Sequence, residues 1–280
     1  MRLVRSHGIG NDYLVLASDH PLDAHIVRAL CDRHTGVGGD GVLEHIPSNK
    51  ADHGLRIWNP DGSTAEKSGN GLRIFARYLV DHCLADLTHT VEVGGAVVHC
   101  RVHPEGELVT VQMGQATTAP AEVPTTRPLW DHPLDVAGTT LRVHAVGMGN
   151  PHCVVFVDDR LDAHTSLDDL HWQAWGAALE THPYFPNRTN VQLVQVVDRN
   201  TLALRVFERG AGPTRASGSS ACAAAVAGVK SGRVDSPVQV QMQGGTLQIS
   251  VDARLHVVMT GPVEEIAVIQ TTRSFGPSAR

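Results

Sequence analysis

The sequence of 280 residues has few cysteines and no segment as long and apolar as a membrane-spanning helix. Its five cysteines are odd in number and scattered without a C-x-x-C pair, so neither a disulfide framework nor a zinc knuckle is predicted. No apolar stretch reaches the roughly 18 residues of a membrane span, and the first residues have no run typical of a signal peptide. We therefore expect a cytoplasmic protein with reduced thiols and no membrane partner.

A surplus of basic residues is also missing. The formal net charge is -6 and the isoelectric point is near 6.3, which argues against a nucleic-acid partner. The 17 histidines form neither an H-E-x-x-H motif nor a cluster with carboxylates, so no metal site is predicted. The letters G-x-G-x-x-G at residues 36–41 follow a predicted helix instead of a strand, and neither a phosphate loop nor a G-x-S-x-G hydrolase elbow occurs. Nucleotide binding and hydrolysis are therefore disfavoured.

The chain does contain helical and alternating patterns. Amphipathic spacing predicts helices from about Pro21 to Gly36 and from Ser166 to Thr181. Two more helices are predicted from Ser68 and from Ser217, and the second is small or apolar all round, which indicates burial at the centre of a domain. Alternation predicts strands at 92–102, 108–113, 140–146, 202–207, 238–243 and 246–251.

The sequence repeats itself. WNPDGSTAEKSGNG at 58–71 aligns without a gap with FERGAGPTRASGSS at 207–220, and GIGN at 8–11 and GMGN at 147–150 precede them in the same order. Two matches in one order predict two related domains. The proline-rich stretch 116–128 marks a boundary, so we expect domains at 1–117 and 118–262, with the tail from about 263 returning to the first.

The repeated S-G segments predict anion binding at two helix starts. The first N–H groups of a helix have no intrahelical partner, and the helix dipole leaves about half a positive charge there. Small residues let a carboxylate approach these N–H groups, and two such starts facing one cleft would suit an amino-acid carboxylate. The alternative is that the two serines simply cap their helices. The backbone donors concerned are Gly69, Asn70, Gly218 and Ser219.

Five segments of the chain resemble, in order and spacing, the motifs of the diaminopimelate epimerase family. They are GIGND, NPDGSTAEKSGNG, GMGNPH, RTNV and FERGAGPTRASGSSA, and the resemblance extends from residue 3 to about 262. This resemblance implies an α+β fold of two pseudo-symmetric domains, each with antiparallel strands curled around a central helix, and an active site in the cleft between them. It also implies an isomerase that converts LL- to meso-diaminopimelate, in lysine and peptidoglycan precursor synthesis, by proton transfer at the two faces of the α carbon. No pyridoxal phosphate, metal or other cofactor is implied, the substrate is the expected partner, and a homodimer is left open.

The resemblance also implies roles for individual residues. His152 and Glu208 match positions thought to tune the two catalytic groups, and the four backbone donors above would bind the carboxylate at the reacting carbon. The family often has Gln where this chain has Gly41. Taken singly, an Asn is as readily a turn residue or cap, and an Arg a solvated charge. The implied side-chain contacts with substrate are Asn11, Asn59, Asn150, Asn190, Glu208 and Arg209.

The catalytic positions depart from the family pattern. The family uses two cysteines, one as thiolate base and one as thiol acid, and this chain has Ser68 and Ser217 instead. A thiol has a pKa near 8.5 and a hydroxyl one near that of water, about 15.7, so the gap of roughly 7 units corresponds to about 10 kcal/mol. Environments shift a pKa by about 3–5 units at most, so another base must assist or activity is low.

Three explanations stay open for the two serines. His152 could accept the serine proton and Glu208 could serve the other face, with the helix starts stabilising developing charge. The chain could instead be a relative with altered chemistry, as in the proline racemases, hydroxyproline dehydratases and phenazine-pathway isomerase of the wider superfamily. It could also be a binding protein that keeps the carboxylate site, or a laboratory double substitution that traps ligand.

Overall fold

The computed structural model describes residues 1–17, 22–105, 107–162, 165–272 and 275. The chain forms two compact units, one of residues 1–112 together with the segment from Thr260 onward, and one of Met113–Met259. The chain passes from unit to unit inside strands β8 (Leu108–Gln115) and β17 (His256–Pro262), whereas the sequence placed the boundaries at 117/118 and near 262. Within the described ranges, no helix is long and apolar enough to span a membrane.

The first unit surrounds the helix α2 (Gly69–Asp81), which packs against β1, β2 and β7. β1 pairs with both β2 and β18, and the Met1 ammonium donates to Thr271 Oγ1 at 3.0 Å. Its other elements, in chain order, are β1 (Arg2–Gly8), β2 (Asn11–Ala17), α1 (Ala24–Cys31), β3 (Val42–Ile46), β4 (His53–Trp58), β5 (Thr64–Ala65), β6 (Thr88–Val93), β7 (Ala96–Val102) and β18 (Glu264–Gln270).

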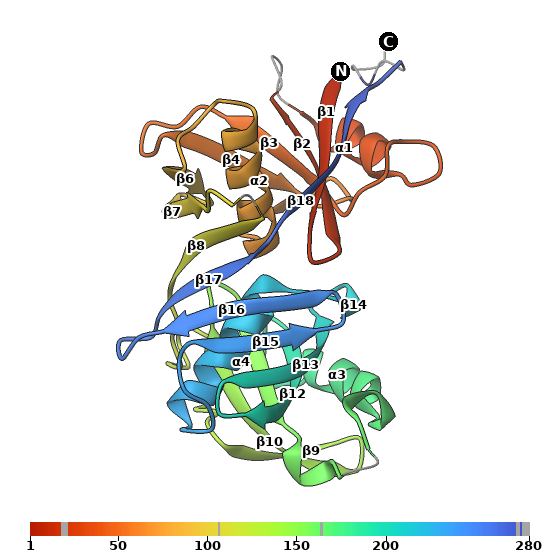
Figure 1. Ribbon diagram of the computed structural model, residues 1–280. Helices are drawn as coiled ribbons and strands as arrows, with labels where there is room; N and C mark the ends of the chain where they lie inside the picture. Colours follow the sequence, from red (N-terminus) through yellow and green to blue (C-terminus); the bar gives the residue numbers. More distant parts are fainter. Residues whose placement is uncertain (18–21, 106, 163–164, 273–274, 276–280) are drawn as a thin grey trace. The chain divides into compact units, whose positions relative to one another are not determined.

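The second unit surrounds α4 (Gly218–Lys230), which packs against strands β10 to β13, β15 and β16 (Figure 1). Ten of the thirteen α4 residues are buried, which confirms the central helix that the small residues predicted. The other elements are β9 (His132–Val136), β10 (Thr139–Gly147), β11 (Pro151–Phe156), α3 (Trp172–Glu180), β12 (Asn190–Asp198), β13 (Thr201–Glu208), β14 (Gly212–Thr214), β15 (Val238–Met242) and β16 (Gly245–Val251), with short 3-10 turns at Asp158–Arg160 and Leu167–Asp169.

Strand pairing repeats between the two units. In the first, β1–β2 is antiparallel, β2–β3 parallel, β3–β4 antiparallel, β4–β6 parallel and β6–β7 antiparallel. In the second, β10–β11, β11–β12, β12–β13, β13–β15 and β15–β16 follow the same series. Parallel neighbours need a crossover connection, and helices α1 to α4 supply these crossovers. The fold is therefore α+β with two pseudo-symmetric units, mostly antiparallel but with two parallel pairs in each.

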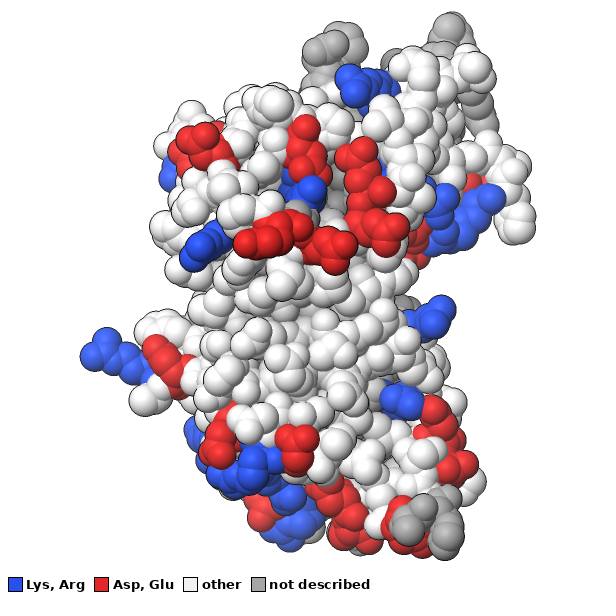
Figure 2. Space-filling model, viewed as in Figure 1, with Lys and Arg blue, Asp and Glu red and all other residues white. Residues whose placement is uncertain are grey.

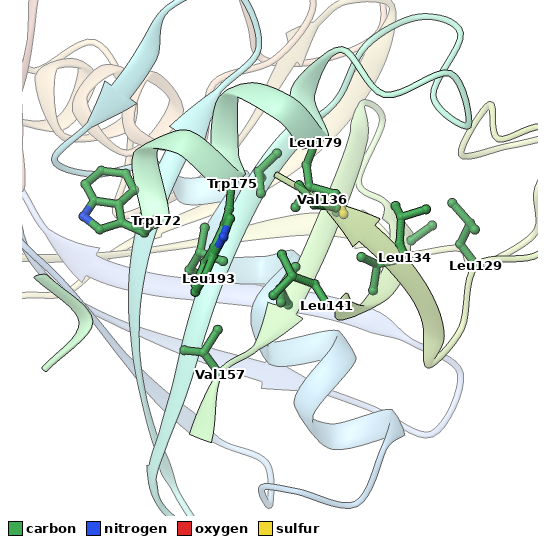
Figure 3. Close-up of a cluster of buried hydrophobic side chains, with 14 of the residues drawn as sticks. Leu129, Leu134, Val136, Leu141, Val157, Trp172, Trp175, Leu179 and Leu193 are labelled. Carbon is green, nitrogen blue, oxygen red and sulfur yellow. The ribbon is translucent and has the colours of Figure 1, made fainter. Parts of the chain in front are cut away.

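Each outer helix completes an apolar core. In the second unit, Trp172, Trp175 and Leu179 of α3 belong to one buried cluster with Leu141 and Leu193 from the strands (Figure 3). In the first unit, α1 contributes Ile26, Val27 and Leu30 to a cluster with Leu14 and Val42. A fully buried side chain of this kind contributes about 1.5–3 kcal/mol through the hydrophobic effect, so the amphipathic pattern of these helices is explained by burial.

Two predicted elements differ from the structure. The strand predicted at 92–102 is a hairpin, because Gly94 and Gly95 adopt φ of +56° and +81° and turn the chain between β6 and β7. The helix predicted from Ser166 to Thr181 is split, because Leu170 is extended with φ -78° and ψ 155° after the 3-10 turn, and α3 begins at Trp172.

The first outer helix is shorter than predicted. Pro21, the expected start, lies outside the described residues, and Asp23 caps α1 by accepting from the Ile26 N–H at 2.8 Å. The helix ends at Cys31, and the Gly36 N–H then donates to the Asp32 carbonyl at 2.9 Å. A Cβ on Gly36 would lie 2.1 Å from the Ala29 carbonyl oxygen, so glycine is required there by close backbone packing.

Candidate active site

The start of α2 has the geometry of an anion site. Ser68 is extended, with φ -136° and ψ 120°, and its Oγ accepts from the Gly71 N–H at 3.0 Å. Its carbonyl accepts the first helical hydrogen bond, from Leu72 at 2.9 Å. The N–H groups of Gly69 and Asn70 therefore precede the helical hydrogen-bond ladder and are oriented to donate to a ligand anion.

The start of α4 repeats this backbone with different side-chain contacts. Ser217 has φ -148° and ψ 121°, and its carbonyl accepts from the Ala221 N–H at 3.0 Å. Its side chain makes no capping hydrogen bond within α4, and its N–H lies 3.5 Å from Met242 Sδ. The backbone donors at Gly218 and Ser219 thus correspond to those of α2, whereas the two serine hydroxyls have different surroundings.

A chain of side-chain hydrogen bonds joins the α2 start to Asn11. Arg73, fully buried, donates to Asn70 Oδ1 at 2.8 Å, and Asn70 Nδ2 donates to Asn11 Oδ1 at 3.2 Å. Asn11 Nδ2 donates in turn to Asp40 Oδ2 at 2.8 Å. These contacts fix which end of each amide faces which neighbour, so the structure brings together two residues that the sequence singled out, Asn11 and Asn70.

Asp40 and Asp12 share one arginine, Arg33, and Asp12 also pairs with Arg5. Arg33 lies 2.7 Å from Asp40 and 2.6 Å from Asp12, and Arg5 lies 2.6 Å from Asp12. Burial acts to raise the pKa of Asp12, but the hydrogen bonds and charges of Arg33 and Arg5 together hold it below its usual range. Sequence reasoning missed Arg73, Asp40 and Arg33 as supports of the site. Asp40 lies within the glycine-rich stretch that matched the dinucleotide fingerprint in letters alone.

Asn59 and Gly41 lie at the end of β4 and near the start of β3. Asn59 occupies the turn into β5, where its Nδ2 donates to Ser63 Oγ at 2.9 Å. A Cβ on Gly41 would lie 2.3 Å from the Trp58 carbonyl oxygen and 2.8 Å from Tyr13 Cε1. A glutamine therefore cannot occupy position 41 without a backbone shift, and the Tyr13 ring fills space beside it.

His152 in β11 is a buried, neutral imidazole. Its Nε2 lies 2.8 Å from Asn150 Oδ1, and its Nδ1 lies 3.1 Å from Gln192 Nε2. Complete burial, with the positive charge of Arg209, lowers the pKa of His152 to about 3. Both ring nitrogens are thus engaged inside the second unit, so the geometry favours orientation of Asn150 over acceptance of a serine proton. With Oδ1 facing His152, the Nδ2 end of Asn150 is the end that can donate to a ligand.

Asn190 and Arg209 meet at the ends of β12 and β13. Asn190 Oδ1 accepts from the Arg209 N–H at 3.0 Å, and its Nδ2 donates to the Pro151 carbonyl at 3.0 Å. Arg209 is exposed and donates from Nη1 to the Asn187 carbonyl at 3.2 Å. Glu208, half-buried, is the last residue of β13 and begins a tight turn, because its carbonyl accepts from the Ala211 N–H at 3.2 Å. The structure therefore clusters Asn150, His152, Asn190 and Arg209 in one unit.

Three buried cysteines are not disposed to act as thiolates. Burial raises the pKa of Cys31 to about 11 and of Cys100 to about 12, and it raises the pKa of Cys153 further. Among the described residues no group of three or more His, Cys, Asp or Glu side chains has metal-binding geometry. On the face drawn in Figure 2, acidic and basic side chains are interspersed. The groups available near the helix starts are therefore hydroxyls, amides, backbone N–H groups and the exposed Arg209.

Comparison with known proteins finds relatives that align with nearly the whole chain. The sequence model of the family described as diaminopimelate epimerase matches residues 3–119 and 144–266. The diaminopimelate epimerase of Pelotomaculum thermopropionicum is 40% identical and aligns with 95% of this chain and 97% of its own, and that of Azoarcus is 42% identical, with 94% and 95% covered. In fold, a probable proline racemase of Agrobacterium radiobacter has a TM-score of 0.73 at 13% identity, over 98% of this chain and 93% of its own. A hydroxyproline epimerase of Agrobacterium vitis, solved with trans-4-hydroxy-L-proline, has a TM-score of 0.71 at 13% identity, over 96% and 91%. The chain belongs to the diaminopimelate epimerase family.

Proposed function

We propose that the protein is a cofactor-independent isomerase that converts LL- to meso-diaminopimelate by transferring protons at the two faces of the α carbon. The observation that carries this proposal is the repetition of one helix start in two units, each with a serine N-cap followed by small residues. Membership of the family supplies the substrate class, since curated relatives at about 40% identity bear that name.

In this proposal one substrate molecule is bound by residues of both units. The backbone N–H groups of Gly69, Asn70, Gly218 and Ser219 bind the carboxylate at the reacting carbon, where fixed donors favour the charge that spreads into it during carbanion formation. Six polar side chains hold the distal ammonium and carboxylate and the α-amino group. They are Asn11, Asn59, Asn150, Asn190, Glu208 and Arg209. Positions 68 and 217 face the two sides of the α carbon. We further propose that the enzyme acts in the cytoplasm.

The serines at 68 and 217 favour a second candidate, a protein that binds diaminopimelate with little or no catalysis. A hydroxyl is a far weaker acid than a thiol, as the pKa gap of about 7 units indicates. Binding to the helix starts does not need a thiol, so such a protein would keep affinity and lose turnover.

Hydrogen exchange separates the two candidates. LL-diaminopimelate is incubated with the protein in heavy water, and the amino acid is then analysed by mass spectrometry and chiral chromatography. Deuterium at the α carbon together with meso product supports the isomerase, whereas calorimetric binding without exchange supports the binding protein. Absence of both binding and exchange overturns the proposed function. A Ser68→Cys/Ser217→Cys variant that binds substrate but still exchanges no hydrogen shows that the two positions are wrongly assigned.

The oligomeric state has its own measurement. We propose a homodimer, for which sedimentation velocity should give a mass near twice the 30.0 kDa of the chain. A monomer at the concentration of the activity assay would contradict the homodimer and leave the reaction untouched.

A further inference from the structure

The hydroxyl oxygen of Ser68 accepts hydrogen bonds from a strand and from its own helix, whereas the Ser217 side chain makes no capping hydrogen bond in α4. The Tyr13 phenol on β2 donates to Ser68 Oγ at 3.3 Å, across 55 positions of sequence, and the Gly71 N–H donates to the same oxygen at 3.0 Å. Such contacts are often long in proteins without substrate and shorten in the reacting complex. Since two donors point at Ser68 Oγ, the hydroxyl hydrogen of Ser68 is left to point toward a third group.

The Tyr13 ring is held in place by its surroundings. Tyr13 is 7% exposed, and the missing side chain of Gly41 makes room for it, since a Cβ there would lie 2.8 Å from Cε1 and 3.2 Å from Cδ1 of the ring. A buried, closely packed ring keeps its phenol oxygen beside Ser68 without loss of side-chain freedom at each turnover.

The repeat gives Tyr13 a counterpart in the second unit. GIGNDY at 8–13 corresponds to GMGNPH at 147–152, so Tyr13 and His152 hold equivalent positions on β2 and β11. His152 is engaged through both ring nitrogens by Asn150 and Gln192. Tyr13 instead directs its polar group at the residue that caps the central helix. The two helix starts are therefore chemically unequal although their backbones match.

A phenol suits proton transfer at the α carbon, a step that a serine hydroxyl alone performs poorly. A tyrosine phenol has an ordinary pKa of about 10, which makes it nearly six orders of magnitude (~5.7 pKa units) more acidic than a hydroxyl with the pKa of water. It is about thirtyfold less acidic than a thiol with a pKa near 8.5. A phenol coupled to Ser68 thus recovers most of the acidity that the replacement of a thiol removes.

We propose that Tyr13 and Ser68 form a two-hydroxyl proton relay that serves one face of the α carbon, an inference that rests on the proposed function. When the carbanion is protonated, the Ser68 Oγ–H bond breaks as the hydrogen joins the α carbon, and the Tyr13 hydrogen transfers to Ser68 Oγ and leaves a phenolate. In the other direction, the phenolate takes the Ser68 hydrogen while Ser68 Oγ takes the α hydrogen, whose electron pair stays on carbon. Tyr13 acts through Ser68, so it is a positioning residue in this scheme and Ser68 is the catalytic one.

The relay predicts a specific dependence on Tyr13. Tyr13→Phe keeps the ring and removes the oxygen, and it should lower α-hydrogen exchange at least a hundredfold with less than a threefold change in KM. Tyr78→Phe is the matched control, because it removes a phenol from α2 that stacks on Phe75, and it should change exchange less than threefold. In the direction that uses the phenolate, the exchange rate should rise with pH as the Tyr13 phenol ionises, and Tyr13→Phe should abolish that rise.

A rescue experiment separates the relay from a structural role of Tyr13. In a Ser68→Cys background the thiol ionises by itself, so adding Tyr13→Phe should cost less than threefold, and the rise in rate should move to about pH 8.5. Equal losses from Tyr13→Phe in the unsubstituted protein and in the Ser68→Cys background would overturn the relay. Replacing tyrosine with a fluorinated tyrosine of lower phenol pKa supplies a second readout, because the rise should shift to lower pH by the same amount.

Failure of the relay differs visibly from failure of the function. If the protein with Ser68 and Ser217 exchanges no α hydrogen while Ser68→Cys/Ser217→Cys does, the relay is wrong and the isomerase site is correctly placed. If neither protein exchanges or binds diaminopimelate, the proposed function itself is wrong, and the relay, which rests on it, is overturned with it.

Discussion

Gln192 Nε2 lies 3.1 Å from His152 Nδ1, and neither side chain has exposed surface. The same amide nitrogen donates to Ser220 Oγ at 3.0 Å, in the first turn of α4. A strand residue two positions after Asn190 therefore orients the ring that in turn orients Asn150. The second unit sets the orientation of the Asn150 amide from inside its own core.

The neutrality of His152 should appear in the pH dependence of stability. The pKa of His152 is about 3 in the folded chain because of burial and the charge of Arg209, against about 6.5 when unfolded. Between these values the unfolded chain binds a proton that the folded chain does not, so stability falls as pH falls, by about 1.4 kcal/mol per pH unit. Urea unfolding of the unsubstituted protein and of His152→Asn should show a difference in unfolding free energy that shrinks below pH 6.5. Parallel pH profiles would contradict a buried neutral ring.

Asp40 should control ligand affinity through Asn11. Asp40→Ala removes the acceptor of Asn11 Nδ2 at 2.8 Å and the partner of Arg33, so the Asn11 amide can rotate away from the ligand. We expect calorimetry to show diaminopimelate binding about tenfold weaker, which corresponds to about 1.4 kcal/mol. Asp252→Ala is the control, because Asp252 accepts hydrogen bonds in a surface turn of the other unit. Equal affinities of the two variants would show that Asp40 does not orient Asn11.

Glu44 should contribute strongly to the stability of the fold, because it is the acceptor for buried donors. This side chain in β3 is 2% exposed and accepts from Trp58 Nε1 at 2.9 Å, from the Leu22 N–H at 3.2 Å and from Arg56. Glu44→Leu leaves buried donors without their acceptor and should cost about 2–4 kcal/mol in urea unfolding. Glu44→Gln keeps one carbonyl oxygen toward the indole and should lose clearly less. Equal losses would mean that the negative charge, which both variants remove, is responsible and that the remaining carbonyl acceptor is not.

Gly176→Ala in α3 should not give the increase in stability that alanine usually gives inside a helix. Gly to Ala inside a helix normally stabilises by about 1 kcal/mol, but a Cβ here would lie 2.7 Å from Phe207 Cγ. Overpacking of this kind costs about 1–3 kcal/mol, so Gly176→Ala should destabilise the chain and displace the ring next to Glu208. Ala177→Gly, on the exposed side of α3, measures helix propensity alone. An increase in unfolding free energy for Gly176→Ala would show that Phe207 moves without cost.

The sequence predicted those features that repeat or that depend on neighbouring residues. The aligned segments at 58–71 and 207–220 correctly indicated two related units, and the run of small residues from Ser217 correctly indicated a buried central helix. Local geometry overrode the pattern at two places. Gly94 and Gly95 turned a continuous alternation into a hairpin, and Leu170 interrupted a helix whose amphipathic spacing continued past it.

The supports of the site left no comparable signal in sequence. The contacts between Asn70 and Asn11 and between Ser68 and Tyr13 join positions 59 and 55 residues apart, which packing of α2 against β2 brings together and residue spacing does not predict. The neutral state of His152 likewise depends on its burial, which the residue type alone does not indicate. Residue types therefore located the helix starts, while the protonation and orientation of their neighbours needed the fold.

The pairing of β1 with β18 affects the order in which the protein can be completed during synthesis. β1 and β2 leave the ribosome early, but the partner on the other edge of β1 follows only after all of Met113–Met259. The second unit is one uninterrupted stretch and can reach its native contacts as soon as β17 has emerged, whereas the first has to wait with an open edge on β1. Synthesis of the first unit therefore begins first, but the second unit can complete its folding first.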